Sequence, residues 1–166
     1  VLLRLDHACA QRGGHTFARI EVELFEPGRR GCRGAVLDAR ARSLKLDNEK
    51  ARAIANRETG IGCDQVIVLE PSKTADVRMR IWNISGEEVE SCGNASRCVA
   101  DLLFDEKRAQ SASIDTAGGL LHARKAGERM VTIDNGPPRF GWRDIPLSEE
   151  FRDTRMIELQ VGPIDA

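Results

Sequence analysis

The strongest hydrophobic pattern in the chain begins just after Cys92. Apolar side chains recur at the three- and four-residue intervals of one helix face, at Ala95, Cys98, Val99, Leu102 and Leu103. Polar side chains fall between them, at Ser96, Arg97, Asp101 and Asp105. The pattern predicts one long helix that buries the apolar face, turns the polar face to solvent and has Cys92 at its N-terminal end. Cys98, inside the apolar face, is expected to be an inert core residue.

Period-two alternation and short apolar runs predict strands on both sides of this helix. They cover residues 35–38, 63–70, 77–83, 112–116, 120–124 and 130–134, with weaker candidates at 1–6 and 17–24. Glycine-rich or polar turns separate them, at residues 59–62, 85–86, 117–119 and 125–128. The continuous apolar run at 63–70 indicates burial on both faces of that strand. Many short strands with one long buried helix predict the α+β class.

A second, shorter helix is predicted between the first two of these strands. Asp47 or Asn48 is its expected N-cap, and it ends near Arg57. The remaining segments are expected to be a loop at 27–34, a loop at 140–145 that packs Trp142, a helical turn within 146–153 and a last strand at 155–161.

Length, charge and cysteine content narrow the class of protein. At 166 residues the chain fits one globular domain, and its net charge of −1 shows no footprint for nucleic acid. No apolar run approaches bilayer length and no secretory signal is visible, so neither a membrane partner nor export is expected. Five irregularly spaced cysteines favour a reducing compartment, here the cytoplasm, and three histidines without zinc spacing argue against a metal site.

Two interpretations of Cys92 follow from the residues alone. At the N-terminus of a helix, unpaired N–H groups and the positive end of the helix dipole stabilise a thiolate, which favours a reactive cysteine. The N–H groups of Gly93, Asn94 and Ala95 could also hold a substrate carboxylate. The alternative is a small inert hydrophobic residue, which is the more common role of a cysteine in apolar surroundings. The spacing of the residues does not decide between the two.

Two amide side chains stand where predicted strands begin or end. Gln65 lies at the start of the strand at 63–70, where it either faces a site or bonds backbone as an edge residue. Asn83 ends the apolar face of the strand at 77–83, where an amide needs hydrogen-bond partners. Because Asn83 and Cys92 flank one predicted hairpin, we expect them to lie near each other.

Five stretches of the chain resemble the diaminopimelate epimerase family, between residue 35 and the C-terminus. They are Thr59-Gly-Ile-Gly-Cys-Asp-Gln65, Met79-Arg-Ile-Trp-Asn83, Gly86-Glu-Glu-Val-Glu-Ser-Cys-Gly-Asn-Ala-Ser-Arg-Cys98, Asp115-Thr-Ala-Gly118 and Asn135-Gly-Pro-Pro-Arg-Phe140. The third stretch is highly specific. The resemblance implies a fold of two similar halves with the substrate in the cleft between them. In each half, a mixed sheet wraps around one central buried helix.

The resemblance also implies a reaction and its residues. The family interconverts LL- and meso-diaminopimelate in lysine biosynthesis without pyridoxal phosphate, using two cysteines on opposite sides of the substrate α-carbon as acid and base. Cys92 is implied to be one of these two cysteines. Gly93 and Asn94 are implied to contact the substrate carboxylate or amino group, and Gln65 and Asn83 to be substrate-contacting amides. No cofactor is implied.

Two parts of the family pattern have no counterpart in this sequence. The family's Gly-Leu-Gly-Asn-Asp-Phe opening is replaced, which marks residues 1–34 as an atypical segment and 35–166 as a diaminopimelate-epimerase-like N-terminal domain. The second half, with the second cysteine, is absent, so the chain is expected to be a truncated half. The missing half, or a second copy in a homodimer, would complete it. The alternatives are a non-catalytic half that binds a partner or self-associates, and a redox-sensing thiol protein.

Overall fold

The computed structural model describes residues 3–6, 21–24, 34–128, 130–145 and 147–157. The chain separates into two compact units, residues 1–135 and 136–166, which are described one at a time. In the first unit, β1 (Leu3–Asp6) and β2 (Glu21–Leu24) pair antiparallel in a two-stranded sheet of their own. These strands confirm the weaker sequence candidates. The predicted loop at 27–34 lies outside the described residues, apart from Gly34.

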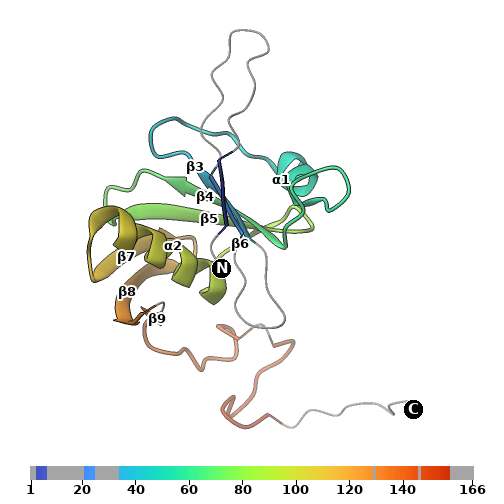
Figure 1. Ribbon diagram of the computed structural model, residues 1–166. Coiled ribbons are helices and arrows are strands. Elements are labelled where there is room, and N and C mark those ends of the chain that lie inside the picture. Colours follow the sequence, from blue (N-terminus) through green and yellow to red (C-terminus); the bar gives the residue numbers. More distant parts are fainter. Residues whose placement is uncertain (1–2, 7–20, 25–33, 129, 146, 158–166) are drawn as a thin grey trace, which may run out of the picture. The chain divides into compact units, whose positions relative to one another are not determined.

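A seven-stranded mixed sheet forms the body of the first unit (Figure 1). Its strands are β3 (Gly34–Asp38), β4 (Gln65–Glu70), β5 (Val77–Asn83), β6 (Glu88–Val89), β7 (Ser111–Thr116), β8 (Gly119–Gly127) and β9 (Met130–Asp134). The order is β3-β4-β5-β7-β8-β9, and β6 pairs with β5 outside this path. The β3/β4 and β5/β7 pairs are parallel and the other pairs are antiparallel. The strands predicted between residues 35 and 134 are therefore confirmed.

β8 runs further than its sequence pattern predicts. The sequence predicts a turn at 125–128, but β8 continues to Gly127, which pairs with Met130. A register shift between Lys125 and Gly127 accommodates an extra residue in the strand. β8 therefore ends at Gly127 rather than near Arg124.

The helix α1 (Asn48–Ala55) covers one face of the sheet. Asp47 caps it, since the Asp47 carboxylate accepts the backbone N–H of Lys50 at 2.9 Å. The N-cap prediction is confirmed, although the helix ends at Ala55 rather than near Arg57. The cluster beneath α1 is formed by one face of β3, β4 and β5 together with the helix, through Ala35, Leu37, Val66, Val68, Trp82, Ala51 and Ala55.

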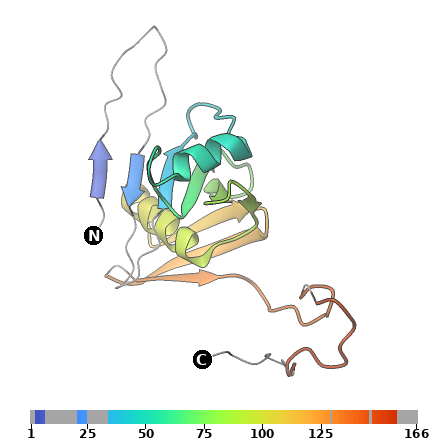
Figure 2. The same ribbon diagram turned by 90° about the vertical axis from the view of Figure 1, so that its right-hand side faces the viewer.

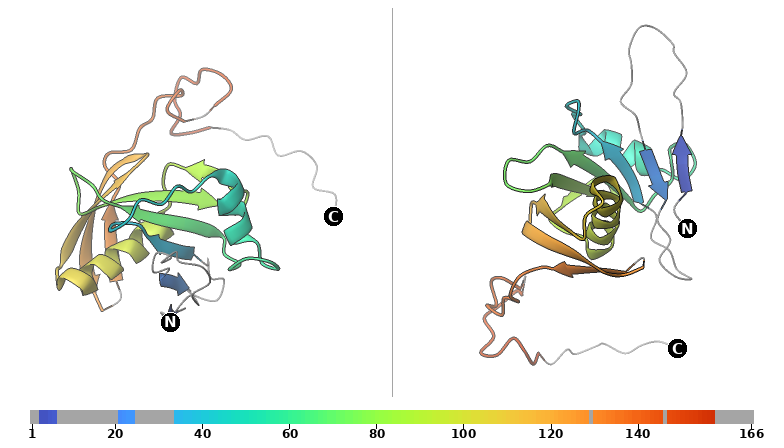
Figure 3. Two further views of the ribbon diagram at one scale, coloured as in Figure 1. Left: turned by 90° about the horizontal axis from the view of Figure 1, so that it is seen from above. Right: turned by 60° about the vertical axis from the view of Figure 1, so that its left-hand side comes forward.

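The helix α2 (Gly93–Lys107) packs on the opposite face and forms the centre of the larger core. The cluster around it takes residues from β3, β4, β5, β7 and β8, and Val131 and Ile133 of β9 pack against it. Figure 2 shows the two helices on either side of the strands, and the right-hand view of Figure 3 shows the strands curving around α2. The predicted class, α+β with a mixed sheet wrapped around one central buried helix, is confirmed.

More of α2 is buried than its sequence pattern predicts. The predicted apolar face is covered, since its residues are at most 7% exposed: Ala95, Cys98, Val99, Leu102 and Leu103. Ser96 is only 1% exposed, although the pattern places it on the solvent face. That prediction for Ser96 is wrong because the curved sheet covers more of the helix circumference than a flat sheet would.

Ionic contacts at its C-terminal end fix the direction of α2. Lys107 contacts Asp76, just before β5, and Glu106 accepts two hydrogen bonds from Arg40, just after β3. α2 has 15 residues and so spans about 22 Å, close to the length of β5. The N-terminus of α2 therefore lies at the other end of the sheet, where β3 and β4 begin and β5 ends.

The described part of the second unit contains neither helix nor strand. The predicted loop at 140–145 is confirmed, with Trp142 half-buried and the Arg143 guanidinium 4.8 Å from its ring centre. The predicted helical turn within 146–153 and strand at 155–161 are wrong for residues 147–157, and the rest of both segments lies outside the described residues. Few apolar residues are buried there, so packing does not stabilise either local pattern.

Asp76 ties three parts of the first unit together. Its carboxylate accepts hydrogen bonds from the Lys107 ammonium of α2, and from the backbone N–H and hydroxyl of Ser113 in β7 at 2.7 and 2.9 Å. The hydrogen bond from Lys107 is the main reason that the pKa of Asp76 is lowered to about 2, and the bond from the Ser113 N–H adds to it. The charged form of Asp76 therefore stabilises the folded chain.

Asp76→Asn should lower the free energy of unfolding by about 1 kcal/mol at neutral pH, a modest amount because solvent screens this partly exposed network. The difference from the wild-type chain should persist above pH ~4, near the ordinary pKa of an aspartate, and shrink as the pH falls through about 2. Urea denaturation across this pH range measures it. A difference that stays constant down to the lowest pH would contradict this role of Asp76.

Candidate functional site

Cys92 is the N-cap residue of α2. Its backbone is extended, with φ −153° and ψ 114°, and the helix begins at Gly93. The thiol makes no capping hydrogen bond, so it does not occupy the N–H groups of the first turn. The side chain is half-buried and packs against the core around α2. The predicted position of Cys92 at the helix N-terminus is confirmed.

Gly93 leaves open space at this end of the helix. A Cβ atom built at Gly93 would meet no heavy atom within 4 Å beyond its chain neighbours and its own helix backbone. The first N–H groups of an α-helix have no acceptor within the helix, and the positive end of the helix dipole lies here. This geometry can accept an anionic group such as a carboxylate close to the backbone.

The amide of Asn94 has a defined orientation. The guanidinium of Arg97, one turn further along α2, donates a hydrogen bond to Asn94 Oδ1. Because a guanidinium has donors only, the amide oxygen must face Arg97, which leaves the amide NH₂ to donate elsewhere. Asn94 is half-buried, so it can offer this donor to a ligand at the helix N-terminus.

Gln65 and Asn83 are directly paired across β4 and β5, and both are half-buried. The Cβ atoms of such a pair lie about 5 Å apart. Alternation along each strand places Gln65 on the face of Ile67, and Asn83 on the face of Ile81. Both isoleucines belong to the core around α2. The two amides therefore lie side by side on the α2 face of the sheet.

The amide pair and Cys92 lie at the same end of the sheet. Gln65 begins β4 and Asn83 ends β5, which is the end where α2 also begins (Figure 1). Asn83 and Cys92 nevertheless do not pair across the hairpin. The Asn83 N–H donates to the Glu87 carbonyl at 2.9 Å, and β6 lies between Glu87 and Cys92 in the chain. A ligand that contacts both must therefore reach across the hairpin.

Two contacts that support Cys92 were not foreseen from the sequence. Gly118, in the turn between β7 and β8, donates its N–H to the Glu90 carbonyl at 3.1 Å and so holds the segment that leads into α2. The Ser96 hydroxyl donates to the Cys92 carbonyl at 2.9 Å. The spacing of four residues between Cys92 and Ser96 is a signal that indicates the second contact, since helical serines often bond back by one turn.

The other cysteines among the described residues are not accessible to a ligand. Cys63 and Cys98 are buried, and burial raises the pKa of the Cys63 thiol. Within the described ranges, no group of three His, Cys, Asp or Glu side chains could hold a metal ion. No helix in this part of the chain has the length and apolar content needed to cross a membrane.

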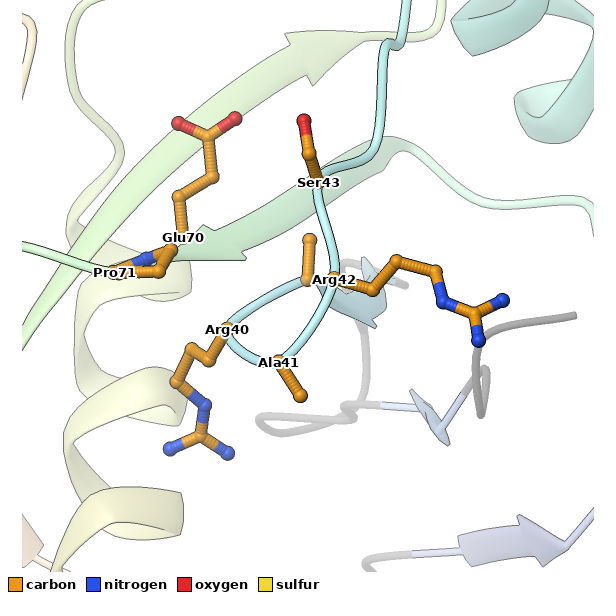
Figure 4. Close-up of a pocket in the computed structure, with 7 residues that line it drawn as sticks. Arg40, Ala41, Arg42, Ser43, Glu70 and Pro71 are labelled. Carbon is orange, nitrogen blue, oxygen red and sulfur yellow. The ribbon is translucent and has the colours of Figure 1, made fainter.

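A pocket of about 490 Å³ opens at the opposite end of the sheet, after β3 and β4 (Figure 4). It is lined by Ala39, Arg40, Ala41, Arg42, Ser43, Glu70 and Pro71. Figure 4 shows the side chains of Arg40 and Arg42 pointing away from Glu70. Arg40 is bound to Asp38 and Glu106. The pocket therefore contains none of the predicted site residues and is separate from Cys92.

Known proteins are similar to this chain over the region that contains the candidate site. The fold and the placement of Cys92 define an α+β protein with a cysteine at the N-terminus of its central helix. The profile of the family described as "Diaminopimelate epimerase" matches residues 35–141, which include both helices, the sheet from β3 to β9 and the candidate site. The chain therefore belongs to the diaminopimelate epimerase family.

Individual relatives agree with this assignment. A diaminopimelate epimerase from Phenylobacterium zucineum is 46% identical over 124 residues, covering 75% of this chain and 44% of the relative. One from Caulobacter sp. is 49% identical over 126 residues, covering 71% and 43%. The chain thus spans less than half the length of these curated relatives. The solved structure of a hydroxyproline epimerase from Agrobacterium vitis is similar over 62% of this chain and 38% of the epimerase chain. The sequence identity is 19% and the TM-score is 0.47, so this similarity carries no argument about function.

Gly93 and Gly86 should respond differently to alanine. Gly93→Ala should leave the free energy of unfolding unchanged, or raise it by up to about 1 kcal/mol, because the position is open and alanine favours a helix. Gly86→Ala should lower it by about 2 kcal/mol or more, because φ is +84° and an added Cβ would lie 2.3 Å from the Asn48 carbonyl oxygen. Urea denaturation compares the variants. An equal loss of the free energy of unfolding in Gly93→Ala and Gly86→Ala would contradict this, because it would show that packing within the chain requires Gly93.

Proposed function

We propose that this chain forms the Cys92 side of a diaminopimelate epimerase site. Cys92 acts as one of two cysteines that exchange a proton at the α-carbon, and the LL and meso forms interconvert without pyridoxal phosphate. The observation that carries the proposal is the position of Cys92 at the N-cap of a buried helix, half-buried and without a capping bond, inside the span that the family matches. The process implied is lysine biosynthesis in the cytoplasm.

The weak acidity of the substrate explains why this position suits the reaction. An amino-acid α-hydrogen is a very weak acid, and no cofactor delocalises the charge left behind in this proposal. Hydrogen-bond donors in fixed directions around the carboxylate must therefore stabilise that charge. The backbone N–H groups of Gly93 and Asn94 supply such donors. The α-carbon then lies against the Cys92 sulfur, which takes or returns the hydrogen on its own face.

We assign Gln65 and Asn83 to the far end of the substrate. Diaminopimelate carries an amino and a carboxyl group at each end, so its far end presents both donors and acceptors. Paired amides also offer both kinds of group. Their position on the α2 face, across β6 from Cys92, supports this assignment. The Asn94 amide, oriented by Arg97, donates at the reacting end.

In this proposal the second cysteine comes from outside the described residues. Cys63 and Cys98 are buried in the core and do not offer a second thiol to a ligand. Residues 35–166 then act as the N-terminal domain, with 1–34 as an atypical segment. The partner that faces Cys92 is the other half of the family fold or a second copy of this chain across a twofold axis.

Hydrogen exchange at the substrate α-carbon tests the proposal. The purified chain is incubated with LL- and meso-diaminopimelate in deuterium oxide, and the α-hydrogen signals are followed by NMR. A single base reaches one face of the α-carbon, so the chain alone should exchange the hydrogen of one configuration only. Cys92→Ala should reduce the exchange rate by about 100-fold or more.

Ser113→Ala is the matched control for this experiment. Ser113 contacts Asp76, near the C-terminal end of α2, so its loss should leave the exchange rate unchanged. Adding the second half of a family member should extend exchange to both configurations. Exchange that persists in Cys92→Ala, or none even with the second half present, would contradict the proposal.

A further inference from the structure

Ser96 binds the backbone of Cys92 twice. Its N–H and its hydroxyl both donate to the Cys92 carbonyl oxygen, each at 2.9 Å. Ser96 is 1% exposed, so its side chain is enclosed by protein. A buried hydroxyl thus bonds to the backbone of the half-buried Cys92.

Helix stability does not explain this contact. The Cys92 carbonyl already accepts the N–H of Ser96, which is the ordinary helical bond between residues four apart. Removing the hydroxyl would therefore leave no carbonyl unpaired. Alanine fits the space of a serine and has the higher helix propensity, and a serine bonded back to the preceding turn slightly destabilises a helix. The hydroxyl donates to the Cys92 carbonyl, so its effect on the chain passes through Cys92.

The Cys92 carbonyl controls the direction of two neighbouring groups. In a trans peptide the C=O of Cys92 and the N–H of Gly93 point in opposite directions, so a fixed carbonyl also fixes the N–H that points out of the helix. The same bonds hold ψ of Cys92 at 114°, and with it the place of the sulfur relative to the first turn. Packing at Gly93 cannot supply this restraint, because the space around its Cβ position is open.

We infer that Ser96 is a positioning residue for this site. Its hydroxyl holds the peptide between Cys92 and Gly93 so that the Gly93 N–H and the Cys92 sulfur face the same ligand. The ligand class that this geometry suits is a carboxylate whose neighbouring carbon lies beside the sulfur. The importance of Ser96 for a reaction rests on the proposed epimerase function, whereas the positioning itself does not.

Alkylation of Cys92 measures the positioning without a substrate. The chain is treated with iodoacetamide, and modification is timed by mass spectrometry on the tryptic peptide of residues 81–97, in which Cys92 is the single cysteine. Ser96→Ala should react about three- to tenfold more slowly, the range expected for loss of one hydrogen bond. The sulfur would no longer keep a fixed place beside the N–H groups of the first turn, so the reactive orientation would be populated less often. Ser96→Thr keeps the hydroxyl and should react at the wild-type rate.

Ser113→Ala separates positioning from stability. It removes a hydroxyl that donates to the Asp76 carboxylate, so it should lower the free energy of unfolding and leave Cys92 alkylation unchanged. The NMR signal of the Gly93 amide should shift in Ser96→Ala and stay in place in Ser113→Ala. Unchanged or faster alkylation of Ser96→Ala overturns the inference. If alkylation slows as expected but the wild-type chain exchanges no α-hydrogen, the positioning stands and the epimerase proposal fails.

Discussion

Burial of α2 inside a curved sheet is the constraint on which the rest of the structure depends. Strands from β3 to β9 contribute side chains to the core around this helix. Contacts from Arg40 to Glu106 and from Lys107 to Asp76 hold its C-terminal end. A rigid helix held in this way must begin at the end of the sheet where β4 starts and β5 stops. The position of Cys92 at the same end as two amides therefore follows from packing rather than from contact between them.

Local sequence pattern predicts the elements of this fold well, because most of them bury one clear face. The helical spacing after Cys92 and the alternation of residues 77–83 each match a surface that the structure covers. The failures have physical causes. The sequence pattern places Ser96 on the solvent-exposed face because it assumes that half of the helix surface is covered. The curved sheet covers more of α2 than that, and Ser96 is buried. Residues 155–157 carry a strand-like pattern, but no strand in the described part of the second unit pairs with them.

The candidate site is only partly predictable from the sequence, because some of its residues are brought together by the fold rather than by the chain. Cys92, Gly93 and Asn94 are adjacent in the chain, so a sequence motif and the helix boundary are enough to bring them together. The pairing of Gln65 with Asn83 depends on the register of β4 and β5, which local pattern does not contain. The bonds that orient the site, from Ser96 to the Cys92 carbonyl and from Arg97 to Asn94, depend on side-chain directions along α2.

The N-terminus of α2 and the amide pair are proposed to form one binding site. Titration of the ¹⁵N-labelled chain with LL-diaminopimelate, followed by NMR, tests it most directly. The backbone signals of Gly93 and Asn94 should shift together with the side-chain amide signals of Gln65 and Asn83, with one dissociation constant. Separate dissociation constants for the helix end and the amide pair, or shifts confined to the pocket around Ser43, would contradict it.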